Sequence, residues 1–239
     1  MKNYIYGKNA VENTIRNFLI EIKQVFILKG NSFNPEVFSI IRQNNLEWHS
    51  LERQEFNSLI KEGVNHQGII AQVRDFNYLE LKDFYNNSKL KQKVLILDKI
   101  QDPQNFGSII RTASLFGVDG IIIQESNQVQ VTPSVMKASA GTIYNVPIIK
   151  VSNLKSAISS LKDRGFWIYS SHLSENSKSI GEIDFDNKSV IILGNEGNGI
   201  GSKIIEMSDF TFKIETNNVI DSLNVSVAAG IILFELSKK

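Results

Sequence analysis

The sequence predicts an α/β protein, with a small α/β module at its start and a larger parallel-sheet domain after it. From residue 94 onward, short runs of β-branched residues alternate with helical patterns, which is typical of a parallel sheet covered by helices on both faces. A polar, charged stretch at residues 75–93 separates the two parts. The chain has 239 residues, enough for one large domain or two modest domains, each able to bury a core.

The first 74 residues are predicted to form the compact module. Apolar residues at positions 11, 15, 18 and 19 have the spacing of an amphipathic helix. Asn34-Pro35 can cap and open a second helix, and a third helix with Phe56, Leu59 and Ile60 is expected to stop at Gly63. Residues 22–28 and 68–73 are rich in β-branched side chains and are predicted strands.

Residues 75–92 form the predicted linker, although the apolar residues Leu81, Phe84 and Tyr85 are also compatible with a short amphipathic helix. Residues 93–239 are expected to form the second domain. Its predicted strands are residues 94–97, 120–123, 146–151, 167–170, 190–193 and 210–214. Its predicted helices are residues 106–116, 133–140, 154–162, 202–207 and 223–236. Parallel sheets bind ligands beyond the carboxyl ends of their strands, so the loops there are the candidate sites.

Composition narrows the function without selecting one. The formal net charge is +1, so any nucleic-acid binding must come from locally placed cations. The chain has no cysteine, which excludes disulfides, thiolate zinc sites and cysteine nucleophiles. No apolar run is long enough for a signal peptide or a membrane span. We therefore expect a soluble cytoplasmic protein, and we assign no metal ligands.

The first candidate loop follows residues 94–97 and reads DKIQDPQNFGSIIRTASLFG. Asp102-Pro103 is a turn signal, and Gly107 permits a close approach of the backbone to a ligand. Asn105 and Arg111 are the polar side chains of interest. From this segment alone, an ordinary surface role for Arg111 is favoured, because long cationic side chains commonly lie along apolar helices.

The second candidate loop follows residues 190–193 and reads GNEGNGIG. Four glycines around Glu196 allow backbone conformations that other residues avoid, so main-chain groups can hold a small ligand. The spacing fits neither the dinucleotide-binding GxGxxG pattern nor the P-loop. A flexible turn is the alternative interpretation.

The third segment reads IETNNVIDSLNVSVAAGIILFEL. Asp221 or Ser222 can cap a helix whose apolar face, beginning with Leu223, packs against the sheet. Asn224 is then expected in the first turn, beside free backbone N–H donors. By itself this segment indicates an ordinary capped core helix.

Together the three segments resemble the motifs of the SpoU (TrmH) branch of the SPOUT methyltransferases. DPQNFGSIIRTASLFGV, ILGNEGNGI and SLNVSVAAGI stand in the family's order and at its spacing. IYGKNAVENTI near the start and NHQGIIAQV at residues 65–73 resemble the substrate-binding domain of RlmB-type ribosomal RNA methyltransferases. The resemblance covers nearly the whole chain.

The resemblance implies an RNA 2′-O-methyltransferase that uses S-adenosylmethionine, pairs as a homodimer and threads its C-terminal segment into a deep trefoil knot. Carried over residue by residue, Gly194, Ile214 and Leu223 line the cofactor site through backbone groups. The polar positions around the reaction are Asn105, Arg111, Glu196, Ser222 and Asn224. One departure from the family is Glu215-Thr216, which stand where the family usually has Pro-Met; they put the adenine environment in question, but not the fold.

The chemistry suits these groups. A ribose 2′-hydroxyl is a weak nucleophile and a sulfonium methyl is already activated, so catalysis needs alignment and stabilisation of charge on the oxygen. The family's arginine is often described as the base. Arginine stays protonated in proteins, so we expect Arg111 to clamp the neighbouring phosphate and stabilise the alkoxide. Glu196 is expected to orient the loop.

The N-terminal module is expected to bind the RNA. Lys8, Arg16 and Arg74 are candidate phosphate contacts alongside Arg111, and His66 in the NHQG turn is a candidate RNA contact. The other histidines are expected in surface loops. The RlmB likeness implies a guanosine in the peptidyl-transferase loop of 23S rRNA.

Three alternatives stay open. A relative that methylates transfer RNA would share the chemistry, although such enzymes generally lack this N-terminal module. A noncatalytic RNA-binding or ribosome-assembly protein would share the fold, but the intact Asn105, Arg111, Glu196 and Asn224 argue against it. A Rossmann-type oxidoreductase is disfavoured by the missing fingerprint.

Overall fold

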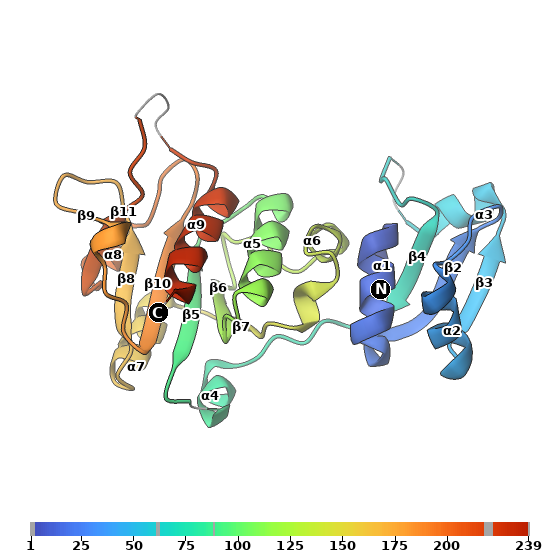
Figure 1. Cartoon of the computed structure of the whole chain (residues 1–239), viewed down its shortest axis with the longest axis horizontal. Coiled ribbons are helices and arrows are strands. Elements are labelled where there is room, and N and C mark those ends of the chain that lie inside the picture. The colour runs from blue at the N-terminus through green and yellow to red at the C-terminus, as the bar shows by residue number, and fades with distance from the viewer. Residues whose placement is uncertain (1–2, 61–62, 88, 218–221, 239) are drawn as a thin grey trace. The chain divides into compact units, whose positions relative to one another are not determined.

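The computed structural model describes residues 3–60, 63–87, 89–217 and 222–238. The chain divides into two compact units (Figure 1). Unit 1 comprises residues 1–77 together with residues 131–144, and unit 2 comprises residues 78–130 and 145–239. The α/β fold class predicted from the sequence is confirmed, with a four-stranded sheet in unit 1 and a seven-stranded sheet in unit 2.

Unit 1 is a mixed sheet with helices. Its strands are β1 (Asn3–Tyr6), β2 (Ile22–Leu28), β3 (Glu47–Leu51) and β4 (Ile69–Val73), in the order β1-β4-β2-β3. Its helices are α1 (Lys8–Asn17), η1 (Leu19–Glu21), α2 (Pro35–Gln43), α3 (Arg53–Ser58), α6 (Pro133–Ala138) and η3 (Thr142–Tyr144). Among these strands, only β2 and β3 pair in parallel.

The sequence patterns located most of unit 1 but missed two strands and misplaced two helix ends. β1 has only four residues, and β3 reads EWHSL with little burial, so neither shows a clear alternation of apolar and polar residues. α1 ends at Asn17, because Phe18 leaves the helical backbone conformation at φ −139°. α3 ends at Ser58, before Leu59 and Ile60. The predicted cap is confirmed: the Asn34 side chain accepts a hydrogen bond from the Glu36 backbone N–H at 3.0 Å.

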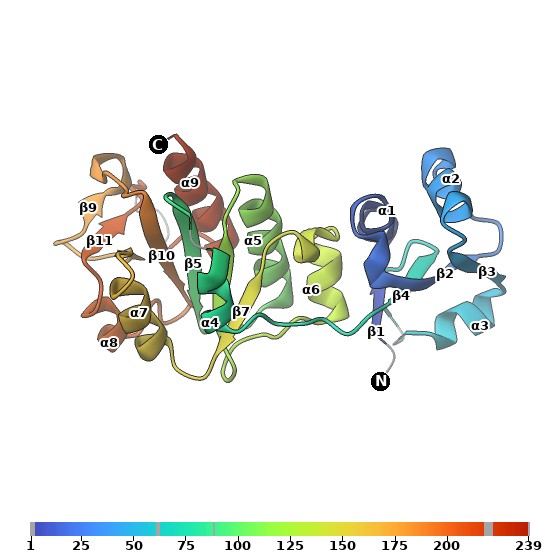
Figure 2. The ribbon, with the colours of Figure 1, turned by 90° about the horizontal axis from the view of Figure 1, so that it is seen from below.

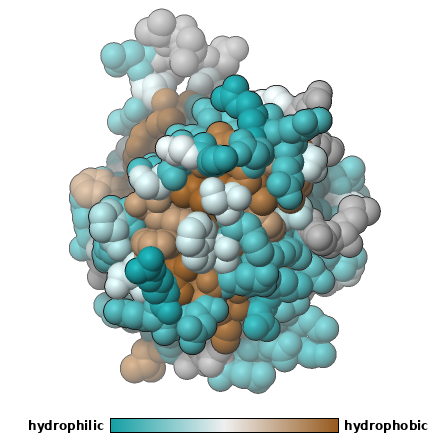
Figure 3. Space-filling view, turned by 90° about the vertical axis from the view of Figure 1, so that its right-hand side faces the viewer, coloured by the Kyte–Doolittle hydropathy of each residue, from teal (hydrophilic) through white to brown (hydrophobic). Residues whose placement is uncertain are grey.

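An aromatic cluster covers one side of β3. Trp48 is 41% exposed, and its ring lies edge-on to Phe33 and Phe38, with centroids 6.2 and 5.4 Å away. Arg42 stacks over Phe38 at 4.5 Å. Figure 3 views the chain from the side of α2, β3 and α3, where apolar residues show between hydrophilic ones.

Unit 2 is an all-parallel sheet in the order β7-β6-β5-β10-β8-β11-β9. Its strands are β5 (Gln92–Asp98), β6 (Gly120–Gln124), β7 (Ile148–Val151), β8 (Trp167–Ser171), β9 (Lys178–Ser179), β10 (Lys188–Gly194) and β11 (Phe210–Lys213). Its helices are α4 (Leu81–Phe84), η2 (Tyr85–Asn87), α5 (Pro103–Leu115), α7 (Leu154–Lys162), η4 (Ile180–Glu182), α8 (Ser202–Ile205) and α9 (Val225–Ser237). The short helix considered for the predicted linker is thus present as α4.

Helices cover both faces of this sheet, as the alternating pattern predicts. Figure 2 shows α5 and α9 on one face and α4, α7 and α8 on the other. The strands β5, β6 and β10 are almost wholly buried, which explains their continuous apolar sequences. Because all strands are parallel, their carboxyl ends meet at one edge. Among the described residues, no helix is long and apolar enough to cross a membrane.

Candidate active site

The N-terminus of α5 positions Asn105 at the carboxyl edge of the sheet. Asp102 caps the helix by accepting a hydrogen bond from the Gln104 backbone N–H at 3.0 Å, and Pro103 opens it. Proline suits this position because its missing N–H would be unpaired there anyway. Asn105 therefore lies in the first turn, with only 9% of its surface exposed.

The loop after β10 folds back on itself and presents Glu196. Asn195 and Gly199 exchange both backbone hydrogen bonds, at 3.1 and 2.8 Å. Gly199 has φ +64°, and a Cβ on Gly194 would lie 2.2 Å from the Gly199 carbonyl carbon. A side chain at position 194 is therefore excluded. Glu196 is exposed in this loop.

The third segment supplies Asn224 as the N-cap of α9. Its side-chain oxygen accepts hydrogen bonds from the Ser226 and Val227 backbone N–H groups, at 2.9 and 3.4 Å. The helix start predicted at residue 223 is wrong, because Asn224 takes the capping role two residues after Ser222. The other predicted cap, Asp221, lies outside the described residues.

Hydrogen bonds join these three segments in a chain. The Asn224 side-chain N–H donates to Asn105 Oδ1 at 3.0 Å, and the Asn105 side-chain N–H donates to Glu196 Oε1 at 2.5 Å. Residues separated by 119 and 91 positions in the sequence thus meet. Asn224 thus donates to Asn105, and Asn105 donates in turn to the Glu196 carboxylate. The positive end of the α9 dipole lies beside Asn224, at the opposite end of this hydrogen-bonded series from Glu196. We call this the Asn224–Asn105–Glu196 chain.

The predicted cofactor-lining residues lie at the same sheet edge. Gly194 ends β10, and Ile214 directly follows β11; β8 lies between these two strands. Leu223 directly precedes Asn224 of the chain. All three are half-buried, so each is partly accessible to a ligand. Glu215 and Thr216, next to Ile214, are exposed.

Arg111 and Ser222 are not part of the hydrogen-bonded chain. Arg111 is exposed on α5, six residues after Asn105, which puts it about 120° around the helix and about 9 Å along it. In the part of the chain that the structure describes, its guanidinium makes no hydrogen bond or ion pair. Ser222 is exposed.

Two supporting residues carried no role in the sequence predictions. The Asn195 side chain accepts hydrogen bonds from the Gly197 and Asn198 backbone N–H groups and donates one to the Lys99 carbonyl at 2.9 Å. Asp98, only 2% exposed, accepts the Gly201 backbone N–H at 2.9 Å. An asparagine among glycines favours such a turn, and a carboxylate that ends an apolar strand requires a donor. Both signals are readable in the sequence.

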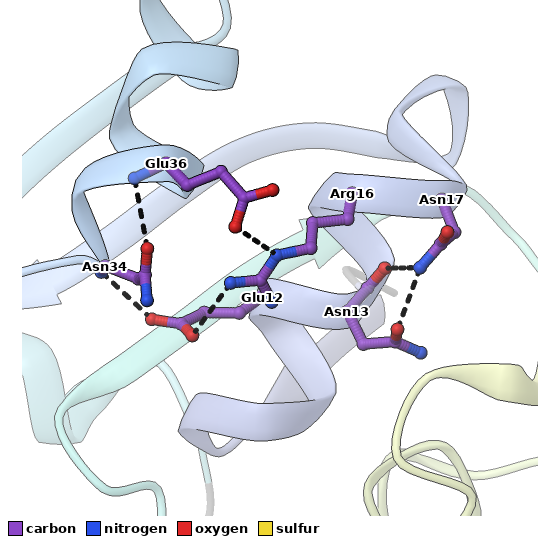
Figure 4. Close-up of polar contacts among 6 residues, drawn as sticks. All are labelled: Glu12, Asn13, Arg16, Asn17, Asn34 and Glu36. Carbon is purple, nitrogen blue, oxygen red and sulfur yellow. Dashed lines mark hydrogen bonds and ion pairs between the residues drawn. The ribbon is translucent and has the colours of Figure 1, made fainter.

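Among the predicted RNA contacts in unit 1, Arg16 is engaged by carboxylates. Figure 4 shows its guanidinium between Glu12 and Glu36, with N–O distances of 3.8 and 3.3 Å. Glu12 is 6% exposed and also accepts the Asn34 backbone N–H at 3.1 Å. Arg16 thus joins α1 to α2. Lys8 and Arg74 are exposed, and within the described ranges their charged groups make no ion pair.

His66 lies in a cationic part of unit 1. Its Nδ1 accepts the Gly68 backbone N–H at 3.0 Å, so the neutral ring carries its proton on Nε2. Burial lowers the pKa of His66, and the positive charges of Arg53 and Lys137 lower it further. The Lys137 ammonium donates to the Asn65 carbonyl at 2.7 Å. Lys137 was not predicted, because it lies far from this turn in the sequence.

Comparison with known proteins decides the family. Residues 92–234 match the SpoU rRNA Methylase family, and residues 4–79 match the RNA 2'-O ribose methyltransferase substrate binding family. The chain belongs to the SpoU rRNA methylase family. It is an RNA methyltransferase with a substrate-binding region before its catalytic region. The resemblance of the motifs to the SpoU (TrmH) family is confirmed, and the RlmB-type specificity stays a prediction. A putative TrmH family tRNA/rRNA methyltransferase of Bacillus subtilis is 32% identical over 99% of this chain and 96% of its own.

Solved structures share the fold. The AdoMet-bound rRNA methyltransferase from Sinorhizobium meliloti has a TM-score of 0.77 and 23% identity, covering 99% of this chain and 87% of that one. The TrmH/SpoU tRNA modifying enzyme of A. aeolicus has a TM-score of 0.57 and 30% identity, covering 66% of this chain and 81% of that one. The trefoil knot stays a prediction.

Proposed function

We propose that this RNA methyltransferase moves a methyl group from S-adenosylmethionine to a ribose 2′-hydroxyl. The observation that carries the proposal is the Asn224–Asn105–Glu196 chain, which joins all three family motifs at the carboxyl edge of the sheet. Parallel sheets bind their ligands at this edge. A noncatalytic RNA-binding protein would not need three polar side chains joined by hydrogen bonds at this edge.

The residues at this edge fit S-adenosylmethionine. The backbone of Gly199 and Ile200 fills the space that a side chain at Gly194 would need, so only a glycine lets the loop fold back beside the proposed cofactor position. Glu196 supplies a negative charge that complements a sulfonium cation. Gly194, Ile214 and Leu223 would hold the cofactor, with the exposed Glu215 beside them. When bound, the cofactor supplies a methyl group already activated for transfer to oxygen.

The residues of the protein align the reacting groups and stabilise the charge that develops on O2′. Asn105 and Asn224 fix the Glu196 carboxylate, which keeps the loop in one conformation. Arg111 clamps the phosphate next to the target ribose and stabilises negative charge on O2′. With the cofactor bound, the methyl group would pass from sulfur to O2′, the sulfonium would leave as a neutral thioether, and the hydroxyl proton would pass to water. Arg111 does not take that proton, because a guanidinium stays protonated. Ser222, exposed before the cap, completes the polar rim.

We further propose that the active enzyme is a homodimer in which Arg111 serves the partner's site. Within one chain, Arg111 stands apart from the Asn224–Asn105–Glu196 chain and beside an apolar surface. That surface includes Leu115, 74% exposed, and Val227 and Phe234, each 51% exposed, on α5 and α9. Exposed apolar patches of this kind mark interaction sites. A second copy would cover them and bring its own Arg111 to the first copy.

The proposed substrate is a guanosine in the peptidyl-transferase loop of 23S rRNA, bound with the help of the N-terminal region. We propose residues 1–74 as the substrate-binding domain, 75–92 as the linker and 93–239 as the methyltransferase domain, with residues 131–144 packing within unit 1. Support for ribosomal RNA comes from coverage. The match to an rRNA methyltransferase spans 99% of this chain, whereas the match to a tRNA modifying enzyme spans 66%. Lys8, His66 and Arg74 are the proposed RNA contacts.

The substrate is tested by mapping 2′-O-methyl groups in ribosomal and transfer RNA from cells with and without the protein. We expect one guanosine of 23S rRNA to lose its methyl group. If the 23S rRNA pattern is unchanged and a transfer RNA site loses its methyl group, the substrate is transfer RNA and not 23S rRNA. If neither pattern changes, the proposed activity is refuted.

The dimer is tested by mixing two inactive variants, Arg111→Lys and Glu196→Gln. If Arg111 acts in the partner's site, mixed dimers contain one intact site, and random mixing restores about a quarter of the wild-type sites. If both residues act in the same copy, the mixture stays inactive. Calorimetric titration of S-adenosylmethionine into each variant is the control, since Arg111→Lys should retain cofactor binding.

A further inference from the structure

A second feature of the carboxyl edge of unit 2 is a cavity of about 370 Å³ beside the loop that carries Glu196. It lies where β5 ends at Asp98 and β6 ends at Gln124, and α7 begins beside it at Leu154. Gly201 and the first residues of α8, 202–204, also line it. Asn105, Glu196 and Asn224 do not line it, so it is separate from the proposed methyl-transfer site.

Three lysines give this cavity its character. Lys99, Lys155 and Lys203 line it, and all three are exposed. Within the described ranges, their ammonium groups make no ion pair or hydrogen bond. Two other lysines of unit 2, Lys89 and Lys162, do have carboxylate partners and lie 2.6 and 2.7 Å from aspartate oxygens. Ammonium groups gathered without carboxylate partners indicate a site for an anion.

The remaining polar groups of the cavity agree with an anionic ligand. Asp98 is the one carboxylate among the described residues of the lining; it is 2% exposed, and one of its oxygens is bonded to the Gly201 N–H. The lining therefore carries three lysines and a single, largely enclosed carboxylate. Asn153 caps α7 with its side-chain oxygen, at 2.8 Å from the Lys155 backbone nitrogen, and so keeps its amide N–H₂ group as a donor. The positive end of the α7 dipole adds to the field.

The cavity is tied to the catalytic loop on both sides. The Asn195 side chain donates to the Lys99 carbonyl at 2.9 Å, and the Gly201 N–H donates to Asp98. Lys99, in the turn after β5, has φ +62°, a left-handed conformation that is uncommon for residues other than glycine. Glu196 and the cavity are therefore on the same loop, which runs from residue 194 to residue 201.

From this placement we infer that Lys99, Lys155 and Lys203 form a binding site for the RNA backbone phosphates that flank the target nucleotide. The inference rests on the proposed function, because it takes RNA as the ligand, and it adds a second contact surface to the one proposed in unit 1. Phosphate contacts carry no sequence information, but they fix the register and orientation of the nucleic acid. The lysine site would thus hold the strand while the loop at residue 196 holds the reacting ribose.

The test measures RNA binding by the full-length protein without requiring turnover. The probe is a fluorescein-labelled oligouridylate, titrated at several salt concentrations. Removal of three phosphate contacts from a single strand should reduce the slope of log affinity against log salt by about 2, and should weaken binding roughly tenfold or more at low salt. We expect this result for the triple variant K99Q/K155Q/K203Q.

A matched variant separates the site from overall charge. K91Q/K93Q/K178Q removes the same charge from unit 2, at the amino end of β5 and on β9, away from the cavity. It should bind with a near-normal salt slope. K99R/K155R/K203R keeps the charges and should also retain the slope. Calorimetry with S-adenosylmethionine shows whether each variant is folded.

The outcomes distinguish this inference from the proposed function. If the glutamine variant and its matched variant show the same slope and affinity, the lysine site is refuted, even when the wild type methylates RNA. If the glutamine variant alone loses slope, the site stands, even when the wild type methylates no 2′-hydroxyl. Sulfate added at constant ionic strength would further support the site if it weakened RNA binding by the wild type and the matched variant equally, and binding by the glutamine variant less.

Discussion

Asn224 combines a structural role and a site role in one side chain. Its oxygen caps α9, and its N–H₂ group donates to Asn105. The two roles use opposite ends of the amide, so a substitution can remove one and keep the other. Asn105 in turn donates a hydrogen bond to Glu196. The position of the Glu196 loop therefore depends on Asn224, the N-cap of α9, which lies 28 residues after Glu196.

Substitution of Asn224 by aspartate should therefore separate stability from activity. Asn224→Asp keeps a side-chain oxygen that can cap α9. The free energy of unfolding should therefore stay within about 0.5 kcal/mol of wild type. The variant loses the donor to Asn105 and should lower the methylation rate at least about tenfold. Asn224→Ala loses both roles and should also cost about 1 kcal/mol. Near-normal turnover by Asn224→Asp would show that the Asn224–Asn105–Glu196 hydrogen bonds have no part in catalysis. The cap variant Asn34→Ala is the control for stability alone.

A second residue-scale prediction concerns His66. Its folded-state pKa lies below the ordinary value of 6.5 because of burial, Arg53 and Lys137, in that order. Between the folded and the unfolded pKa the unfolded chain binds more protons, so stability rises with pH through this window. The stability is complete above pH 6.5 and is lost as the pH falls towards the folded pKa.

Removing a neighbouring charge should move the His66 titration. Arg53→Gln should raise the pKa of His66 towards its ordinary value, and Lys137→Gln should raise it less, following the order of their contributions. The measurement is an NMR titration of the imidazole resonances. Lys23→Gln, an exposed cation on β2, is the control and should leave the titration in place. An equal shift in all three variants would contradict the assigned causes.

At the scale of single elements, two buried tyrosines show opposite hydrogen bonding. The Tyr144 hydroxyl of η3 is buried and has no hydrogen-bond partner among the described residues. The Tyr169 hydroxyl of β8 donates to the Asp186 carboxylate at 3.0 Å and accepts its backbone N–H at 3.1 Å. Burial raises the pKa of both, that of Tyr169 to about 12, so both hydroxyls stay protonated at neutral pH.

Substituting these two tyrosines by phenylalanine should therefore change the free energy of unfolding in opposite directions. Tyr144→Phe removes an unpaired buried hydroxyl and should leave unit 1 equally stable or up to about 1 kcal/mol more stable. Tyr169→Phe leaves Asp186 without its partner and should cost unit 2 about 1–2 kcal/mol. Scanning calorimetry, with the transitions of the two units followed separately, measures both. A loss of equal size in the two variants would contradict this account.

Elements with local signals were predictable from the sequence. The start of α5 follows from Asp102-Pro103, and the strands of unit 2 from their apolar runs. The strand β3 was missed because its half-exposed residues at a sheet edge show no period. The start of α9 was misplaced because Asp221, Ser222 and Asn224 are all good caps, and only the contact with Asn105 selects one. That contact spans 119 positions, so only the family resemblance could point to it.

At the scale of the whole molecule, unit 1 is not made from one continuous segment. Residues 131–144 leave the sequence of unit 2 between β6 and β7 and pack within unit 1. Val135 and Met136 are buried there, and Gly141 has φ +79° against α1. A Cβ at Gly141 would lie 2.5 Å from Thr14 Oγ1 and 2.7 Å from the Ala10 carbonyl. The substrate-binding region therefore needs a segment from within the range that matches the methylase family.

This connectivity predicts how fragments of the chain fold. A fragment of residues 1–77 lacks α6 and η3 and should unfold at lower temperature than the same fragment joined to residues 131–144 by a glycine-serine linker, because it exposes the apolar surface that they cover. Circular dichroism and amide resonance dispersion measure the difference. Gly141→Ala in the joined fragment should remove more than about 1 kcal/mol, since alanine disfavours a positive φ and its Cβ meets α1. Equal melting temperatures for the two fragments would show that residues 131–144 contribute nothing to unit 1.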